Sequence, residues 1–265
     1  MKRLFGAILP LAAVLFFPAA SAANVNCDHG QSLSKAIGKL KPGETLLVRG
    51  TCVEHLDIGE QVLNVILDGQ GTAAIHGPDA SRFTITIRGR GVRITGFTVS
   101  GGDRGIAILD TGAAVIEANV ITDAANIGVH VGRNSAARIL GNTIRNVAGQ
   151  GINVRLGSGA DIFDNVITQN GTGIDVDSAG AADISGNQVV ANQQDGIRLR
   201  NNSHIRFSSD PDNTATNLIE NNGGFGVSCV RGGTISGNPV DFGAGNAAGN
   251  TSIAGNCLVQ GGVFP

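Results

Sequence analysis

The sequence contains no tryptophan or tyrosine and a single methionine. Sugar rings are often held against tryptophan and tyrosine side chains, so this absence counts against a carbohydrate ligand. No basic run and no basic patch interleaved with aromatic residues is present, so nucleic acid is not an expected partner. No CxxC or Cys/His metal-binding spacing occurs either, which argues against a zinc site.

Long apolar runs are also scarce. The longest covers residues 4–17, which is short for a bilayer span. Lys2 and Arg3 precede it, and Ala20-Ser21-Ala22 follows as a small-x-small cleavage pattern. These features predict a signal peptide over residues 1–22 and a secreted or periplasmic mature protein without a membrane span. An uncleaved anchor is the alternative interpretation.

The mature chain, residues 23–265, is long enough for one domain with a sizeable core. Loss of Lys2 and Arg3 changes its formal charge from −2 to −4. The four cysteines lie near its two ends, and an even number in an exported chain indicates disulfides. Three connectivities exist. We favour Cys27–Cys52 with Cys229–Cys257, because each pair then lies within one end of the chain.

Glycine is abundant, with 40 residues, and much of it belongs to a repeat. An Asn-x-Ile/Val phrase recurs about every 22–23 residues, at Asn119, Asn142, Asn165 and Asn187. A Gly-aliphatic-x-aliphatic phrase keeps step with it, at Gly105, Gly128, Gly151, Gly173 and Gly196. A fixed period of this length indicates a stacked repeat.

One repeat, starting at Gly151, shows what each unit contains. Ile152 and Val154 alternate with polar residues, the period-two pattern of a half-buried strand. Two further short apolar segments follow after glycine- and asparagine-containing bends. Since about 23 residues are too few for a βαβ unit, we expect three short strands per coil, stacked in parallel.

Stacking predicts columns of equivalent residues about 4.8 Å apart. Two inward columns should be Ile106, Val129, Ile152, Ile174 and Ile197, and Ile116, Ile139, Ile162, Ile184 and Ile205. The asparagines should form a buried ladder, with Phe97 in the preceding rung and Asn217 and Asn238 in the next two. A buried amide must be paired, so this ladder is structural.

The ends of a stack need caps. Leu33, Ala36, Ile37 and Leu40 have helical spacing and predict a short N-terminal capping helix within a cap of residues 23–60. Residues 229–265 should form an irregular C-terminal cap. Cys229, at a position equivalent to Val154 and Leu199, should be inward-facing and bonded to Cys257.

These phrases resemble right-handed parallel β-helix repeats of the pectin-lyase-like superfamily. Val25-Asn-Cys, Gly50-Thr-Cys-Val-Glu54 and Ile66-Leu-Asp-Gly-Gln-Gly71 resemble the start of exported bacterial members. The resemblance covers nearly all of the mature chain. It implies an all-β, single-stranded solenoid of about nine or ten coils. Many members bind or cleave acidic polysaccharides such as pectin or alginate, with active sites on the outer face of one sheet, and others have no known chemistry.

The outward residues of the Gly-aliphatic-x-aliphatic strands are candidates for such a site. One column reads Ala107, His130, Asn153, Asp175, Arg198, and the other reads Leu109, Gly132, Arg155, Asp177, Arg200. Asp175 and Asp177 should have Cα atoms roughly 6.6 Å apart, close to the ~6.5–9.5 Å carboxylate separation of inverting glycosidases.

One interpretation is a polysaccharide lyase or glycoside hydrolase acting on a polyuronate. Asp175, Asp177 and His130 would be catalytic. Asn153, Arg155, Arg198 and Arg200 would bind substrate, the arginines through uronate carboxylates. In a lyase, an arginine or His130 would remove the proton α to the carboxylate, and calcium could sit on the aspartates.

The other interpretation is that these residues form cross-strand ion pairs on a solvated surface, each worth well under about 1 kcal/mol. The chain lacks the Asp-Asp, Gly-His-Gly and Arg-Ile-Lys motifs of polygalacturonases and the Arg-x-Pro-x-x-Arg motif of pectate lyases. It would then be a non-catalytic surface or periplasmic scaffold. We expect a monomer with no evident cofactor. Asp210-Pro-Asp-Asn213 is a further weak calcium candidate, because it lacks the glycine and closing glutamate of a calcium loop.

Overall fold

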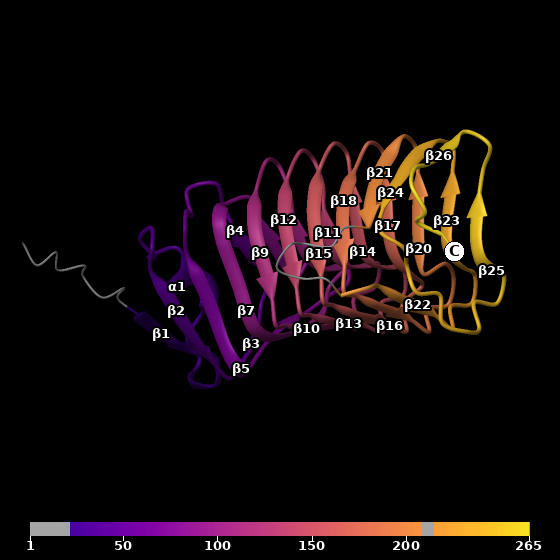
Figure 1. Ribbon diagram of the computed structural model, residues 1–265. Coiled ribbons are helices and arrows are strands. Elements are labelled where there is room, and N and C mark those ends of the chain that lie inside the picture. The colour runs from indigo at the N-terminus through magenta and orange to yellow at the C-terminus, as the bar shows by residue number, and fades with distance from the viewer. Residues whose placement is uncertain (1–21, 208–214, 265) are drawn as a thin grey trace, which may run out of the picture.

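The computed structural model describes residues 22–207 and 215–264. They form an elongated stack of coils, with α1 at one end and β25 and β26 at the other (Figure 1). All paired strands are parallel, as predicted. The predicted signal peptide, apart from Ala22, and the Asp210–Asn213 segment lie outside the described residues.

One sheet of nine strands runs the length of the stack. Its central strands, β8 to β20, carry the glycine phrase, and each strand of the sheet belongs to a different coil. In spatial order they are β4 (Leu56–Ile58), β6 (Ile85–Ile87), β8 (Arg104–Ile108), β11 (Ile127–Val131), β14 (Gln150–Arg155), β17 (Thr172–Asp177), β20 (Ile197–Arg200), β23 (Phe225–Val230) and β25 (Gly249–Ile253). With the incomplete turns at the two ends, these nine strands agree with the nine or ten coils predicted.

The remaining seventeen strands are hydrogen-bonded into a second sheet that bends around the rest of each coil. Those near the N-terminus are β1 (Ala22–Asn26), β2 (Thr45–Arg49), β3 (Thr51–Val53), β5 (Ile66–Gly77), β7 (Arg90–Gly101), β9 (Ala113–Glu117) and β10 (Val120–Thr122). The central ones are β12 (Ala136–Leu140), β13 (Thr143–Arg145), β15 (Gly159–Phe163), β16 (Val166–Thr168), β18 (Ala181–Ser185) and β19 (Gln188–Val190). The last are β21 (Ser203–Phe207), β22 (Leu218–Glu220), β24 (Gly233–Gly237) and β26 (Cys257–Val259).

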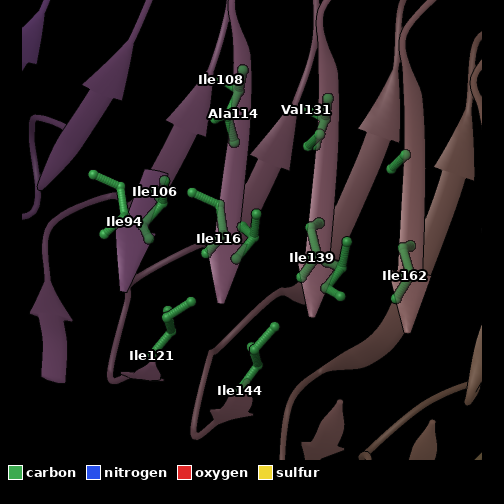
Figure 2. Close-up of a cluster of buried hydrophobic side chains, with 14 of the residues drawn as sticks. Ile94, Ile106, Ile108, Ala114, Ile116, Ile121, Val131, Ile139, Ile144 and Ile162 are labelled. Atoms are coloured by element: carbon green, nitrogen blue, oxygen red, sulfur yellow. The ribbon is translucent and has the colours of Figure 1, made fainter. Parts of the chain in front are cut away.

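The core is a set of aliphatic columns, because every second residue of each strand points inward. Ile116, Ile139 and Ile162 lie in register on β9, β12 and β15, and Figure 2 shows them side by side. The prediction for this column was wrong at its last member. Phe207 follows Ile184, whereas Ile205 follows Ala182. The larger phenylalanine ends the column where the chain leaves β21.

The predicted asparagine ladder is present and buried. The side-chain amide of Asn142 donates to Oδ1 of Asn165 over 3.0 Å and to the carbonyl of Ile116 over 2.8 Å. Oδ1 of Asn165 also accepts the backbone N–H of Asn142 at 2.9 Å. Asn217 continues the ladder, and Phe97 precedes it by donating its backbone N–H to Asn119. Each rung therefore pairs backbone groups of two coils that a buried bend would otherwise leave unpaired.

The expectation for Asn238 was wrong, because its side chain is exposed after β24 and only its backbone N–H bonds to Phe207. A second asparagine ladder, not predicted, lies at the next bend. It consists of Asn170, Asn192, Asn222 and Asn246, joined by amide-to-Oδ1 bonds of 3.0–3.1 Å. Only Asn170 and Asn192 precede the insertion before β22, so the sequence contains too few evenly spaced members to reveal a period.

Both ends are fastened covalently. The predicted disulfides Cys27–Cys52 and Cys229–Cys257 are both formed. The predicted capping helix is α1 (Leu33–Ile37), preceded by the short 3₁₀ helix η1 (Cys27–His29). Leu33 and Ile37 are buried against the first coil. The Glu54 carboxylate accepts the backbone N–H groups of Leu33 and Ser34 and so caps the helix N-terminus.

Regular structure extends further into both predicted caps than expected. Residues 23–60 include β2, β3 and β4, which pair with β5 and β6. Residues 229–265 include β24, β25 and β26, which continue both sheets. The parallel strand pairing of the repeat therefore continues into both ends of the chain, where the sequence no longer contains the repeated phrases.

Candidate functional site

The nine-stranded sheet aligns the candidate residues as predicted. His130 of β11 pairs with Asn153 of β14, which pairs with Asp175 of β17, which pairs with Arg198 of β20. We call these four residues the polar row. Arg155 pairs with Asp177 in the neighbouring column. The regular coil length thus collects residues about 70 positions apart in the chain onto one surface.

Asp175 lies at the centre of this surface and is completely buried. Its Oδ1 accepts hydrogen bonds from Nε of Arg198 at 2.8 Å and Nε of Arg200 at 3.2 Å. Its Oδ2 accepts from Nη2 of Arg200 at 2.9 Å and from the Asn153 amide at 3.0 Å. The carboxylate is therefore a fixed anion held by two half-exposed guanidinium groups and one amide.

Asp177, on the same strand, is only 5% exposed. Its Oδ1 accepts from the Asn201 amide at 2.6 Å and from the Ser178 hydroxyl at 3.1 Å, and Nη2 of Arg200 lies 3.4 Å from Oδ2. Burial opposes ionisation, but these donors and the charges of Arg200 and Arg155 outweigh it and lower the pKa of Asp177. Asp177 is therefore ionised at neutral pH.

His130 is 3% exposed and uncharged. Burial, followed by the nearby Arg104, Arg155 and Arg133 charges, lowers the pKa of His130 to about 3. Nδ1 lies 2.9 Å from Oδ1 of Asn153. Nε2 has no hydrogen-bond partner among the described residues. It is not completely enclosed, because it is absent from the unpaired side-chain atoms that solvent cannot reach. His130 is thus a neutral, buried imidazole whose Nε2 makes no hydrogen bond to the described residues.

Three arginines are close enough for their charges to act on this imidazole: Arg104, Arg155 and Arg133, which we call the arginine cluster. Nε of Arg104 and Nε of Arg155 are buried without a hydrogen-bond partner in the described part of the chain. The ion-pair contact of Arg104 with Asp103, at 3.4 Å, does not have hydrogen-bond geometry. The guanidinium of Arg104 also stacks over Phe83, with 4.5 Å between its carbon and the ring centroid. The described residues thus give Arg104 one carboxylate partner, that of Asp103, and leave Nε of Arg155 without a hydrogen-bond acceptor.

The surface does not match the expectation of flat, solvated ion pairs, because Asp175 and Asp177 are buried and share their donors in one network. Sequence reasoning brought His130, Asn153, Asp175, Asp177, Arg198 and Arg200 together correctly, but it missed Arg104 and Arg133. Arg104 precedes Gly105 and Arg133 follows Gly132, so both lie just outside the alternating positions that were read as outward columns.

Two other features lie away from the polar row. A cleft of about 630 Å³ crosses β9, β12, β15, β18 and β21 of the seventeen-stranded sheet, lined by small residues and by Arg138, Asp161, Asp183 and Arg206. Within residues 22–207 and 215–264, no group of three or more His, Cys, Asp or Glu side chains is arranged to hold a metal ion. The same ranges contain no helix long and apolar enough to cross a membrane.

Comparisons with known structures show the same fold in several polysaccharide-modifying proteins. Pectate lyase Pel9A is 12% identical with a TM-score of 0.61, covering 93% of this chain and 79% of its own. An alginate lyase from Paenibacillus sp. is 17% identical with a TM-score of 0.56, covering 89% and 99%. The periplasmic alginate epimerase AlgG is 15% identical with a TM-score of 0.54, covering 89% and 82%.

No curated protein sequence matches the chain. A family model described as "Right handed beta helix region" matches residues 83–259, more than half of its length. The chain therefore belongs to the right-handed β-helix family, and it shares its fold with the polysaccharide-modifying proteins named above.

Proposed function

We propose that this protein binds an acidic polysaccharide on the outer face of the nine-stranded sheet and removes the proton α to a uronate carboxylate. The observation that carries the proposal is the neutral imidazole of His130, whose Nε2 has no hydrogen-bond partner among the described residues, beside the charges of Arg104, Arg155 and Arg133. A base next to a cationic pocket is the arrangement that proton abstraction from a carboxylate-bearing carbon requires.

The arginine cluster supplies the charge that this reaction needs. A uronate carboxylate bound beside His130 would be attracted by the guanidinium charges of Arg104, Arg133 and Arg155. Burial is the main cause of the low pKa of His130, and the bound carboxylate would offset the arginine charges that lower it further. Binding of the substrate carboxylate therefore raises the basicity of the imidazole that acts on the same sugar.

The chemical step begins with proton transfer to His130. Its Nε2 takes the proton from C5, and the electron pair of the C–H bond moves into the carboxylate, whose negative charge the arginines stabilise. In a lyase this electron pair then forms a C4–C5 double bond while the C4–O4 bond breaks, and the leaving oxygen takes a proton from water. In an epimerase a proton returns to C5 from the opposite face.

A glycoside hydrolase fits the site less well. An inverting hydrolase needs one carboxylic acid with a raised pKa to protonate the leaving group. The pKa of Asp177 is lowered, and both oxygens of Asp175 are occupied by Arg198, Arg200 and Asn153. Since these donors also occupy the positions where calcium would bind, we propose that the two aspartates organise the arginines and hold no metal.

Other observations support an acidic polysaccharide substrate and an exported protein. The similar structures carry the names pectate lyase, alginate lyase and alginate epimerase, and the last is described as periplasmic. The two disulfides fit an oxidising compartment. The absence of tryptophan and tyrosine favours the alternative of a non-catalytic scaffold, because neutral sugar faces would have few aromatic platforms.

The test is a screen of pectate, alginate and related polyuronates with and without calcium. We expect ultraviolet-absorbing unsaturated products from elimination, or a changed C5 configuration by proton NMR, and loss of either in His130→Ala. Reducing ends without unsaturation would indicate hydrolysis and contradict the proposal. Binding without any chemical change, equal in wild type and His130→Ala, would establish the scaffold instead.

A further inference from the structure

The polar row forms a continuous chain of hydrogen bonds that joins four coils. Nδ1 of His130 lies 2.9 Å from Oδ1 of Asn153, and the amide nitrogen of Asn153 lies 3.0 Å from Oδ2 of Asp175. The side chains of His130 and Asn153 are each 3% exposed, and Asp175 is fully buried. Water therefore has little access to replace any of these bonds.

The orientation of the Asn153 amide follows from its neighbours. The atom facing β17 lies within 3.3 Å of two groups of Asp175, its carboxylate Oδ2 and its backbone carbonyl. Both groups are acceptors only, so the atom facing them must be the NH₂ nitrogen. The other end of the amide, Oδ1, then faces Nδ1 of His130 and can only accept.

The tautomer of His130 follows in turn. Because Oδ1 of Asn153 is an acceptor, Nδ1 of His130 must carry the hydrogen, and Nε2 carries the lone pair. Gly132 keeps this nitrogen accessible, since a Cβ at position 132 would lie 2.6 Å from Nε2. The base proposed above thus has its reactive tautomer fixed by a side chain on the next coil.

The Asp175 carboxylate is held firmly enough to impose this order. Arg198 and Arg200 donate three hydrogen bonds to it at 2.8–3.2 Å, on the side away from His130. Its anion cannot rotate without breaking charge-assisted bonds. The arginines therefore fix the donor and acceptor at each link: Asp175 accepts from Asn153, and Asn153 accepts from His130.

We infer that Asp175 and Asn153 are positioning residues that hold His130 in its Nδ1–H tautomer. Asp175 is then neither a general acid nor a nucleophile, and Asn153 does not bind substrate. The catalytic meaning of this inference rests on the proposed function. The tautomer itself is a property of the free protein and is measurable without any substrate.

The decisive variant is Asp175→Asn. Oδ1 accepts from Nε of both arginines, whereas Oδ2 accepts from Nη2 of Arg200 and from Asn153, so we expect the one oxygen of the substituted side chain to stay at the Oδ1 position. Its NH₂ group then faces the Asn153 amide, which gains by rotating to present its oxygen, although it gives up its 3.3 Å contact with the Asp175 backbone carbonyl. The Asn153 NH₂ group then faces Nδ1 of His130 and favours the Nε2–H tautomer.

Proton–nitrogen NMR of ¹⁵N-histidine-labelled protein measures this directly, with the His130 signals identified by their loss in His130→Gln. We expect Nδ1–H in wild type and predominantly Nε2–H in Asp175→Asn. Asp177→Asn, on the same strand but without a hydrogen bond to Asn153, is the matched control and should keep Nδ1–H. Asn153→Ala, in which Asp175 keeps both arginines, should populate both tautomers and remains informative if Asp175→Asn fails to fold.

Turnover provides the second readout. On a polyuronate that wild type modifies, Asp175→Asn should lower kcat by about 10²-fold or more with a smaller change in KM, because the wrong tautomer removes the base. An Nε2–H tautomer in wild type, or one tautomer shared by wild type, Asp175→Asn and Asn153→Ala, would overturn the inference. If no polyuronate is modified but the tautomer inverts, the relay stands and the proposed function fails.

Discussion

At the scale of single residues, the most informative position is Gly132. Its backbone φ is not in the left-handed region, so alanine is conformationally acceptable there. The three atoms nearest to an added Cβ would all belong to the His130 ring, and the closest of them is Nε2. The methyl group of an alanine at this position would therefore collide with the His130 imidazole before any other group.

We expect Gly132→Ala to displace His130 and to lower kcat on any accepted polyuronate by about tenfold or more, because a small misplacement of a base is costly. The thermal midpoint should change little. Gly159→Ala is the matched control, since a Cβ at position 159 meets nothing within 4 Å. Unchanged turnover in Gly132→Ala would mean that Nε2 of His130 does not touch the substrate.

The residue scale also shows where sequence reasoning succeeds and fails. The alternation within each strand correctly placed His130, Asn153, Asp175 and Arg198 in one outward column. It could not predict that Asp175 is buried, because outward charged residues are normally solvated. Burial results from three donors on neighbouring coils converging on one carboxylate, and such convergence depends on side-chain directions that a spacing pattern does not contain.

At the scale of elements, the asparagine ladders determine how one strand follows the next. Asn165 accepts two hydrogen bonds from Asn142, and its own amide donates to Ile139, Phe163 and Asn187. Its removal would leave several buried donors and acceptors unpaired. This dependence explains why the phrase repeats so faithfully in the sequence.

We expect Asn165→Ala to lower the free energy of unfolding by about 2–4 kcal/mol, since each unpaired buried group costs about 1–3 kcal/mol and partial relaxation recovers some of it. Asn238→Ala, at an exposed position off the ladder, should stay within about 0.5 kcal/mol of wild type. Urea unfolding followed by circular dichroism compares the two. Equal losses would show that the ladder adds no stability of its own.

The first ladder was predictable because its members follow one another at an even spacing. The second was not, since only Asn170 and Asn192 precede the insertion that separates them from Asn222, and two members do not establish a period. For the same reason the last coils were expected to be irregular, although β24, β25 and β26 pair normally. Backbone pairing tolerates changes of bend length that erase a sequence period.

At the scale of the whole molecule, the two disulfides are expected to differ in their effect on the site. Cys229 lies on β23, in register with Leu199 of β20, which also carries Arg198 and Arg200. Cys27–Cys52 lies at the opposite end of the stack. In a repeat protein each coil is stabilised mainly by its neighbours. Removing a disulfide should therefore destabilise the coils next to it before the coils at the other end.

We expect the double variant Cys229→Ala, Cys257→Ala to lose about 3 kcal/mol, as for a closed loop of this length, and to lose hydrogen-exchange protection in β20 and β23. The double variant Cys27→Ala, Cys52→Ala should lose protection near α1 and β2 while β20 remains protected. Hydrogen exchange with mass spectrometry resolves these segments. Equal deprotection of β20 in both variants would show that the stack unfolds as one unit.

The placement of the polar row has a consequence for how this chain can change by duplication. Repeat proteins commonly lengthen or shorten by whole units, yet His130, Asn153, Asp175 and Arg198 each come from a different coil. A unit inserted between β11 and β17 would preserve the fold and separate the imidazole from Asp175, and a deletion there would remove a member of the hydrogen-bonded chain. The outer coils can vary in number, whereas the four coils that carry the polar row must stay adjacent, because its hydrogen bonds connect each coil to the next.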